Sequence, residues 1–305
     1  CGDTDIGRFY SGSRRIRTTE FLRREGVRKL DLIVISHLHK DHVGGLLPLC
    51  NEIEVRELWS NWVPQSDDFI EMFLPRNGSG GAKNLVLALQ EFLKALHRLN
   101  KSNTRIENVS QWKKQTYRGL GKNIRVTVSG ADPYLYTLQN DIFNKNVSFM
   151  EFDKFINDTS LRLYITYKGY TVQLPGDVSA AYWERESPEK CNILKVPHHG
   201  HKDSITKTLL EYLRPDYAVI SVSNDRQDPC PHPEILKLIN NYTNKVYFTD
   251  DVSCANQKFI KPTTQEPVLQ GRQADGVCTL RNESKRLLRI GKPEHPDKGR
   301  STVNH

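Results

Sequence analysis

The sequence predicts an α/β protein in which strands alternate with amphipathic helices. Several short apolar runs are typical of buried strands. Four leucines and Phe92 recur at helical spacing over 84–99, which indicates a helix with one apolar face. At 305 residues the chain can bury a full core, as one large domain or as one domain with an insertion. This pattern fits two sheets covered by helices on both outer faces, although it fits other α/β folds equally well.

The elements can be placed in order along the chain. Residues 18–26 predict an amphipathic helix that ends at Gly26. A buried strand follows over 31–36, then a polar loop and a helix over 43–50. The other expected elements are a short strand over 55–59, a loop or lid over 64–81, and strands over 123–129, 161–167, 170–174, 192–196 and 217–222.

The most informative segment is the run from 37 to 42, His-Leu-His-Lys-Asp-His, which directly follows the apolar run 32–35. It places three of the ten histidines and one carboxylate at the end of a buried strand. Imidazole and carboxylate together suit zinc, manganese or iron. Gly44 and Gly45 then allow the backbone to turn tightly beside this predicted metal loop.

This pattern, His-x-His-x-Asp-His followed by Gly-Gly, resembles the metallo-β-lactamase superfamily. In residues 174–177, Leu-Pro-Gly-Asp follows a strand-like run, where the superfamily places a metal-bridging aspartate. Residues 194–200, Leu-Lys-Val-Pro-His-His-Gly, resemble one branch, the nuclease domain of ComEC-type competence proteins and its free-standing soluble relatives. Residues 157–161 and 231–233 match as well. The resemblance covers about 1–252 and implies an αββα sandwich.

The resemblance also implies two divalent metal ions, zinc or manganese, and assigns their ligands. One ion is held by His37 and His39, the other by Asp41, His42 and one of the tandem histidines, and Asp177 bridges both. We favour His198 as the ligand, with His199 behind it or against the substrate, because adjacent residues of an extended segment point in opposite directions. The margin between the two is small.

The first metal lacks a third histidine, which many superfamily members supply from a segment before the bridging aspartate. The single histidine in that interval, His97, lies in the predicted amphipathic helix and is interpreted as a surface or packing residue. Asn157, Asp158 or water could complete the site, and a turn before a strand is an equally good interpretation of Asn157-Asp158. A site with more oxygen ligands would favour manganese over zinc.

These ligands predict a hydrolase, because divalent metals lower the pKa of bound water to about 7. The resemblance implies that a hydroxide held by two metals attacks a phosphodiester, with DNA as the favoured substrate. Asp41 is expected to orient the hydroxide and His199 to contact the substrate. His232, in Pro-His-Pro, could touch the leaving group, although a structural role in a proline-rich turn is an open alternative.

Three other functions are weighed against this one. Phosphorylcholine-type esterases are similar at the tandem histidines and also manage without a third histidine on one metal, which keeps a small-molecule esterase as the alternative. A non-catalytic binding protein that keeps the fold is less favoured, because all the core ligands are present. Hydrolysis of β-lactams is least favoured, since the superfamily name reflects fold and not substrate.

The predicted domains are a hydrolase domain over 1–252, with a helical or loop insertion at about 60–120, a C-terminal extension over 253–280 and a basic, disordered tail over 281–305. The opening Cys-Gly-Asp resembles the interior of a family motif, so the first strands of the fold are expected to precede residue 1. The tail has seven basic and three acidic residues, which is half of the net charge of +8. We favour a solubilising role for it over nucleic-acid binding.

Apolar runs and cysteine spacing indicate where the protein is located in the cell. No apolar run approaches the roughly 20 residues that cross a bilayer, so no membrane-spanning segment is expected. The six cysteines include no C-x-x-C pair and suggest no disulfide framework. Reduced thiols in a cytoplasmic protein are the expectation.

Overall fold

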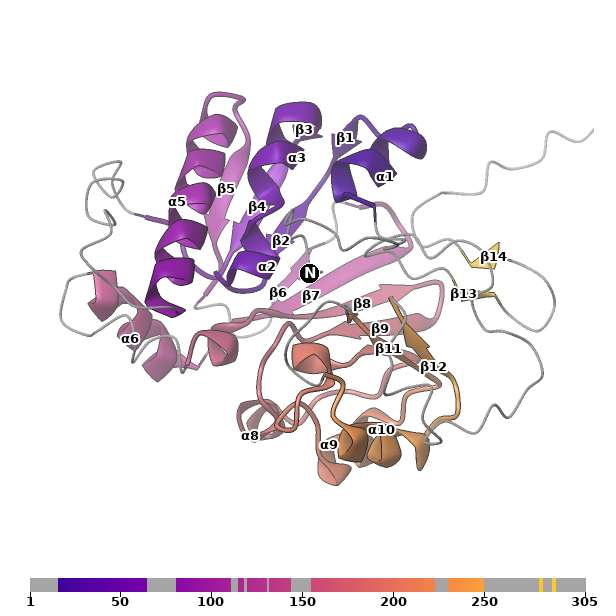
Figure 1. Cartoon of the computed structure of the whole chain (residues 1–305). Helices are drawn as coiled ribbons and strands as arrows, with labels where there is room; N and C mark the ends of the chain where they lie inside the picture. Colours follow the sequence, from indigo (N-terminus) through magenta and orange to yellow (C-terminus); the bar gives the residue numbers. More distant parts are fainter. Residues whose placement is uncertain are drawn as a thin grey trace, which may run out of the picture.

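The computed structural model describes residues 16–64, 81–110, 115–117, 120–130, 132–143, 155–222, 230–249, 280–281 and 287–288. Two sheets lie at the centre of the molecule, and helices cover their outer faces (Figure 1). The helices are α1 Thr18–Arg24, α2 Lys40–Val43, α3 Leu46–Glu52, α5 Gly81–Asn100, α6 Pro133–Phe143, α8 Ala180–Trp183, α9 Lys207–Leu213 and α10 Pro233–Asn240, with 3₁₀ turns η1 Ile156–Thr159, η2 Glu184–Glu186 and η3 Pro197–Gly200.

The smaller sheet has the order β2-β4-β5, and its strands β2 Ile33–Ile35, β4 Glu57–Ser60 and β5 Arg105–Asn108 are parallel. Successive side chains of a strand point to opposite faces, and both faces of this sheet are apolar. Leu58 packs under the helices, in the same cluster as Phe92 of α5. Its neighbour Trp59 packs on the other face with Val128 and Leu163 of the second sheet. Successive side chains of β4 therefore pack alternately against the helices and against the second sheet.

The larger sheet has seven strands in the order β12-β11-β10-β9-β8-β7-β6. Strands β6 to β9 are antiparallel neighbours, whereas β9 to β12 run parallel. Their bounds are β6 Gln115–Tyr117, β7 Ile124–Ser129, β8 Arg162–Tyr167, β9 Tyr170–Leu174, β10 Ile193–Lys195, β11 Tyr217–Ile220 and β12 Val246–Phe248. Two-residue strands pair β1 Lys29–Leu30 with β3 Glu54–Val55 and β13 Leu280–Arg281 with β14 Leu287–Leu288.

The helices form two outer layers. Buried residues of α2, α3 and α5 pack on the smaller sheet, and α8, α9 and α10 pack with β10 and β11 of the larger one. The α/β class predicted from the sequence is confirmed, and this layering agrees with a metallo-β-lactamase-like sandwich. The first strands expected before residue 1 stay a prediction.

The local predictions differ from the structure mainly at glycines and at strand ends. The helix expected over 43–50 corresponds to α3, which begins at Leu46, and a separate short helix, α2, ends at Val43. Gly44 and Gly45 between them keep right-handed helical backbone angles. The helix expected over 84–99 is α5, which is slightly longer. The expected lid over 64–81, most of the extension over 253–280 and most of the tail over 281–305 lie outside the described residues. The domain boundaries stay predictions.

Two predictions from composition can be compared with the described residues. Among their helices, none combines the length and the apolar character needed to cross a bilayer. Cys50, Cys191 and Cys230 are buried free thiols, while the other three cysteines fall outside the described ranges.

Candidate metal centre

The candidate site lies where strand ends of the two sheets meet. β2 leads directly into segment 36–42, whose last three residues open α2. β9 is followed by Asp177, and β10 by the tandem histidines of η3. Because β9 and β10 are parallel neighbours, their carboxyl ends bring these groups to the same edge of the sheet.

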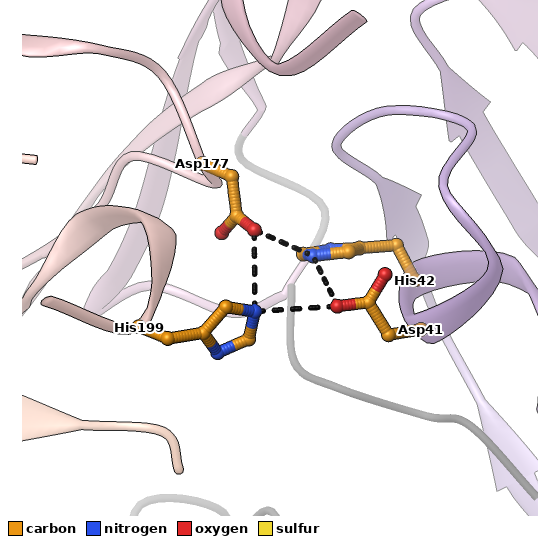
Figure 2. A group of neighbouring side chains, drawn as sticks. All are labelled: Asp41, His42, Asp177 and His199. Atoms are coloured by element: carbon orange, nitrogen blue, oxygen red, sulfur yellow. Dashed lines mark hydrogen bonds and ion pairs between the residues drawn. The ribbon is translucent and has the colours of Figure 1, made fainter. Parts of the chain in front are cut away.

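Four side chains converge there: Asp41 and His42 from α2, and Asp177 and His199 from the larger sheet (Figure 2). His42 Nε2 lies 3.2 Å from Asp177 Oδ2, and His199 Nε2 lies 3.4 Å from the same oxygen. Asp41 Oδ2 is 3.2 Å from His199 Nε2 and 3.9 Å from His42 Nε2. The four ligand atoms lie within 4.8 Å of one another. Two imidazole nitrogens and two carboxylate oxygens are a donor set that fits a divalent transition metal.

The two oxygens of Asp177 face different partners. Oδ1 accepts hydrogen bonds from Lys195 Nζ at 3.1 Å and from the backbone N–H of His198 at 3.3 Å. Oδ2 faces His42 and His199. Burial alone raises the pKa of Asp177, but Lys195, His42 and His199 outweigh burial and hold this pKa well below its usual range. Asp177 is therefore an ionised carboxylate with one oxygen directed at the ligand cluster.

Both carboxylates of the cluster are ionised. Burial raises the pKa of Asp41, whereas His42 and a hydrogen bond from His199 lower it, and the net pKa is below the usual range. Asp41 and Asp177 thus contribute two negative charges, and the ammonium group of Lys195 pairs with Asp177. A divalent cation held by neutral imidazoles and these carboxylates would replace the charge compensation that the histidines provide.

His37 and His39 lie beside this cluster. His37 Nε2 is 3.2 Å from His39 Nδ1, and the rings of His37 and His42 are 4.0 Å apart between centroids. Burial, followed by the charges of His42 and His39, lowers the pKa of His37 well below its usual value. His37 is therefore neutral at pH 7, which is the form that binds metals. Among the described residues, no group of three or more ligand side chains includes this pair.

Two serines that the sequence analysis did not single out orient the histidines. Ser36 Oγ lies 3.3 Å from Nδ1 of His37 and 3.1 Å from Nδ1 of His42. Ser160 Oγ lies 3.1 Å from His37 Nδ1 and accepts the backbone N–H of Asp177 at 3.1 Å. Such contacts at Nδ1 fix the ring orientation and the tautomer of a metal-binding histidine. The only sequence signal for them was proximity to a motif.

The tandem histidines occupy the reverse of the positions that we favoured. His199 joins the ligand cluster, and its Nδ1 lies 2.9 Å from the carbonyl oxygen of Ser221, which leaves Nε2 for a metal. The side chain of His198 instead reaches Asp203, with 3.2 Å between Nδ1 and Oδ1. Both histidines have positive φ, 46° and 56°, so the alternation of an extended strand does not apply to them.

The residues proposed to complete the first metal have other partners. The amide Nδ2 of Asn157 is 3.2 Å from His198 Nε2. Asp158 Oδ1 accepts the backbone N–H of Ser179 at 2.8 Å, and Asp158 belongs to neither group of ligand side chains. Burial raises the pKa of Asp158. Their roles at the metal stay predictions.

His232 lies at the N-terminus of α10, outside the ligand cluster. Its Nδ1 accepts the backbone N–H of Glu234 at 3.3 Å, and its own backbone N–H donates to Gly200 at 2.8 Å. These contacts attach α10 to the turn that carries His199. They fit the structural alternative for His232, and a contact with the leaving group stays a prediction.

Comparison with known proteins agrees with this site. A family model described as "Metallo-beta-lactamase superfamily" matches residues 2–61, which contain the His-x-His-x-Asp-His motif. The matched residues 2–61 are therefore similar to this superfamily. It is also 22% identical over 239 residues to ComE operon protein 3 of Bacillus subtilis (strain 168), over 75% of this chain. The chain spans only 25% of the length of that curated relative.

Two solved structures have weaker similarity to the chain. One, from Parabacteroides distasonis ATCC 8503, is provisionally described as a metal-dependent hydrolase; it is 13% identical, with a TM-score of 0.38 over 72% of this chain and 76% of that one. The other is CmlA, a diiron β-hydroxylase from Streptomyces venezuelae, with 13% identity and a TM-score of 0.33 over 63% of this chain and 35% of that one.

Proposed function

We propose that this protein is a metal-dependent phosphodiesterase of the metallo-β-lactamase superfamily, with DNA as its substrate class. The convergence of Asp41, His42, Asp177 and His199 carries the proposal, because these are the donors that a hydrolytic metal centre needs. The choice of a phosphodiester rests on the resemblance of segment 194–200 to the competence nuclease domain. The similarity to ComE operon protein 3 over three-quarters of this chain supports the same choice.

Asp41, His42, Asp177 and His199, which the observed contacts bring together, would hold one ion. By the family resemblance, His37 and His39 would hold the other ion and share Asp177 with the first. When bound, two divalent ions supply Lewis-acid activation of water and charge stabilisation for a phosphoryl group. Manganese and zinc are both compatible with the set, which is rich in imidazole and carboxylate.

The side chains around the ions have separate tasks. Lys195 and the backbone N–H of His198 hold Oδ1 of Asp177 and thereby direct Oδ2 toward the centre. Ser221 fixes His199 through Nδ1. Asp41 is ionised and its side chain is 27% exposed, so beside its contact with the ion it would orient an attacking water through a hydrogen bond.

The first test is a cleavage assay with single-stranded DNA, double-stranded DNA and bis-p-nitrophenyl phosphate, each with manganese or zinc. The matched variants are Asp177→Asn and Asp31→Asn, the latter an exposed aspartate outside the cluster. We expect metal-dependent cleavage of DNA by the wild type and the Asp31→Asn variant, and a loss of at least about 100-fold in the Asp177→Asn variant.

The remaining outcomes separate the alternatives. If bis-p-nitrophenyl phosphate is cleaved and DNA is not, the proposed substrate class would change from DNA to a small-molecule phosphodiester. p-Nitrophenyl phosphorylcholine is added as a further substrate, and cleavage of it alone would favour the phosphorylcholine-type esterase. That alternative is tested because such esterases also lack a third histidine ligand on one metal. Full activity of the Asp177→Asn variant would contradict the site assignment itself.

A further inference from the structure

The turn that supplies His199 to the metal centre carries a second set of ligand side chains. His198, His201 and Asp203 present ligand atoms that all lie within 4.8 Å of one another. Nδ1 of His198 is 3.2 Å, and Nδ1 of His201 is 2.8 Å, from the same oxygen, Oδ1 of Asp203. Ligand atoms around a tetrahedral zinc ion, at about 2.0–2.2 Å from the metal, are separated by about 3.4 Å. Small side-chain shifts would therefore admit an ion between them.

The backbone already holds these three residues in place. The N–H of His201 donates to the carbonyl of His198 at 2.8 Å, and the N–H of Ser204 donates to the carbonyl of His201 at 2.9 Å. The carbonyl of Asp203 accepts the N–H of Ala180 at 2.8 Å. A loop fixed by its own hydrogen bonds loses little conformational entropy when its side chains bind an ion.

This set is accessible and separate from the first centre. The exposed fractions of the side chains are 25% for His198, 49% for His201 and 52% for Asp203. Hydrogen bonds from His198 and then His201 lower the pKa of Asp203 to about 2, so its carboxylate is charged at neutral pH. His198 touches Asp177 only through its backbone N–H in the contacts described above, and its ring is 6.3 Å from that of His199 between centroids.

Asn157 provides a second, independent observation. Its Nδ2 lies 3.2 Å from Nε2 of His198, while its buried Oδ1 has no hydrogen-bond partner among the described residues. A buried acceptor without a donor is unfavourable. Without a metal, Nδ2 donates to Nε2 of His198, and Nδ1 of that ring donates to Asp203. When a cation takes the place of the Nδ1 proton, the amide can rotate by half a turn so that Oδ1 accepts from Nε2–H, and Nδ1 then offers its lone pair to the ion. Asn157 can therefore partner His198 in the metal-free and in the metal-bound tautomer.

We propose that His198, His201 and Asp203 form an accessory binding site for a zinc-class divalent ion. Two imidazoles and one carboxylate are a ligand set that zinc accepts with three protein ligands and an open fourth position. Because the three side chains are partly exposed, water could supply the fourth ligand. This site is additional to the two ions of the proposed phosphodiesterase and does not depend on that function.

The test is the zinc content of the full chain. Metal-free wild-type protein and variants are dialysed against buffered micromolar free zinc, and bound zinc is measured by atomic absorption. The key variant is His201→Asn, which keeps a hydrogen-bond donor for Asp203. The matched control is His97→Asn, an exposed histidine on α5 that belongs to neither cluster. Asp177→Asn removes a ligand of the first centre only.

We expect the His201→Asn variant to bind one zinc ion fewer per chain than the wild type and the His97→Asn control. The Asp177→Asn variant should keep the accessory ion, which a double variant with His201→Asn should lose. Equal zinc content in the wild type and the His201→Asn variant would overturn the proposal and leave a hydrogen-bonded cluster only. If His201→Asn fails to fold by circular dichroism, Asp203→Asn replaces it, with the same two outcomes.

Discussion

Replacing Lys195 with methionine should destabilise the metal-free protein strongly. The ammonium group of Lys195 lies 3.1 Å from Asp177 Oδ1, and the two side chains are only 7% and 3% exposed. An exposed ion pair contributes about 0–1 kcal/mol, but removal of one partner from a buried pair costs about 3–5 kcal/mol, because the other charge is left uncompensated. With a urea m-value of about 3 kcal/mol/M, the midpoint of unfolding should fall by about 1–1.7 M.

The same variant should respond more strongly to metal than the wild type does. Without Lys195 the charge of Asp177 is compensated poorly in the metal-free state, whereas bound cations compensate it in both proteins. Zinc or manganese should therefore raise the unfolding free energy of the Lys195→Met variant by more than it raises that of the wild type. Urea titrations with and without metal, monitored by circular dichroism, measure both quantities.

An exposed lysine serves as the control for this experiment. Lys122→Met changes the same residue type in a loop position and should leave the midpoint within about 0.2 M of the wild type. Equal midpoints for the Lys195→Met variant and the wild type without metal would refute the buried ion pair. A large loss of stability that added metal does not reduce would refute the orientation of Asp177 toward a metal.

Three further predictions concern the same region. Gly176→Ala should lower the free energy of unfolding by more than about 2 kcal/mol in urea titrations, because φ is +67° and the new Cβ would lie 2.7 Å from the side chain of Ser160. The control Gly26→Ala has a similar φ of +71° but no atom within 4 Å of the new Cβ, so it should lose only the about 1–2 kcal/mol that backbone strain costs. His199→Ala should reduce hydrolysis of bis-p-nitrophenyl phosphate by at least about 100-fold and more than His198→Ala does, and the opposite order would restore the preference based on sequence. The folded-state pKa of Asp177 lies below its unfolded value of about 3.9, so its contribution to stability is present above pH 4 and is lost as the pH falls further. The urea midpoint of the metal-free protein should therefore fall as the pH drops below about 4 toward the folded-state pKa, and a fall of the same size in the Asp177→Asn variant would contradict this assignment.

Much of the fold could be predicted from local patterns. The apolar face of α5 and the strand-like runs of the larger sheet were visible in the sequence, because burial on one face imposes a period on the chain. The boundary between α2 and α3 was missed, because Gly44 and Gly45 keep right-handed helical backbone angles and the helical period continues across them. The order of the strands depends on contacts between distant segments, which no local period records.

The sequence by itself determined the chemistry of the site, and the tertiary structure decided its geometry. Residue type and position after a strand were enough to predict imidazole and carboxylate ligands at 37–42, and the family resemblance added Asp177. The choice between His198 and His199 needed the structure, because two consecutive residues with positive φ do not alternate like a strand. The ion pair of Lys195 with Asp177 also could not be predicted from the sequence, because it forms only when β9 and β10 pair and bury the lysine beside the carboxylate. Local sequence specifies which atoms can bind a metal, and only long-range packing specifies which of them meet.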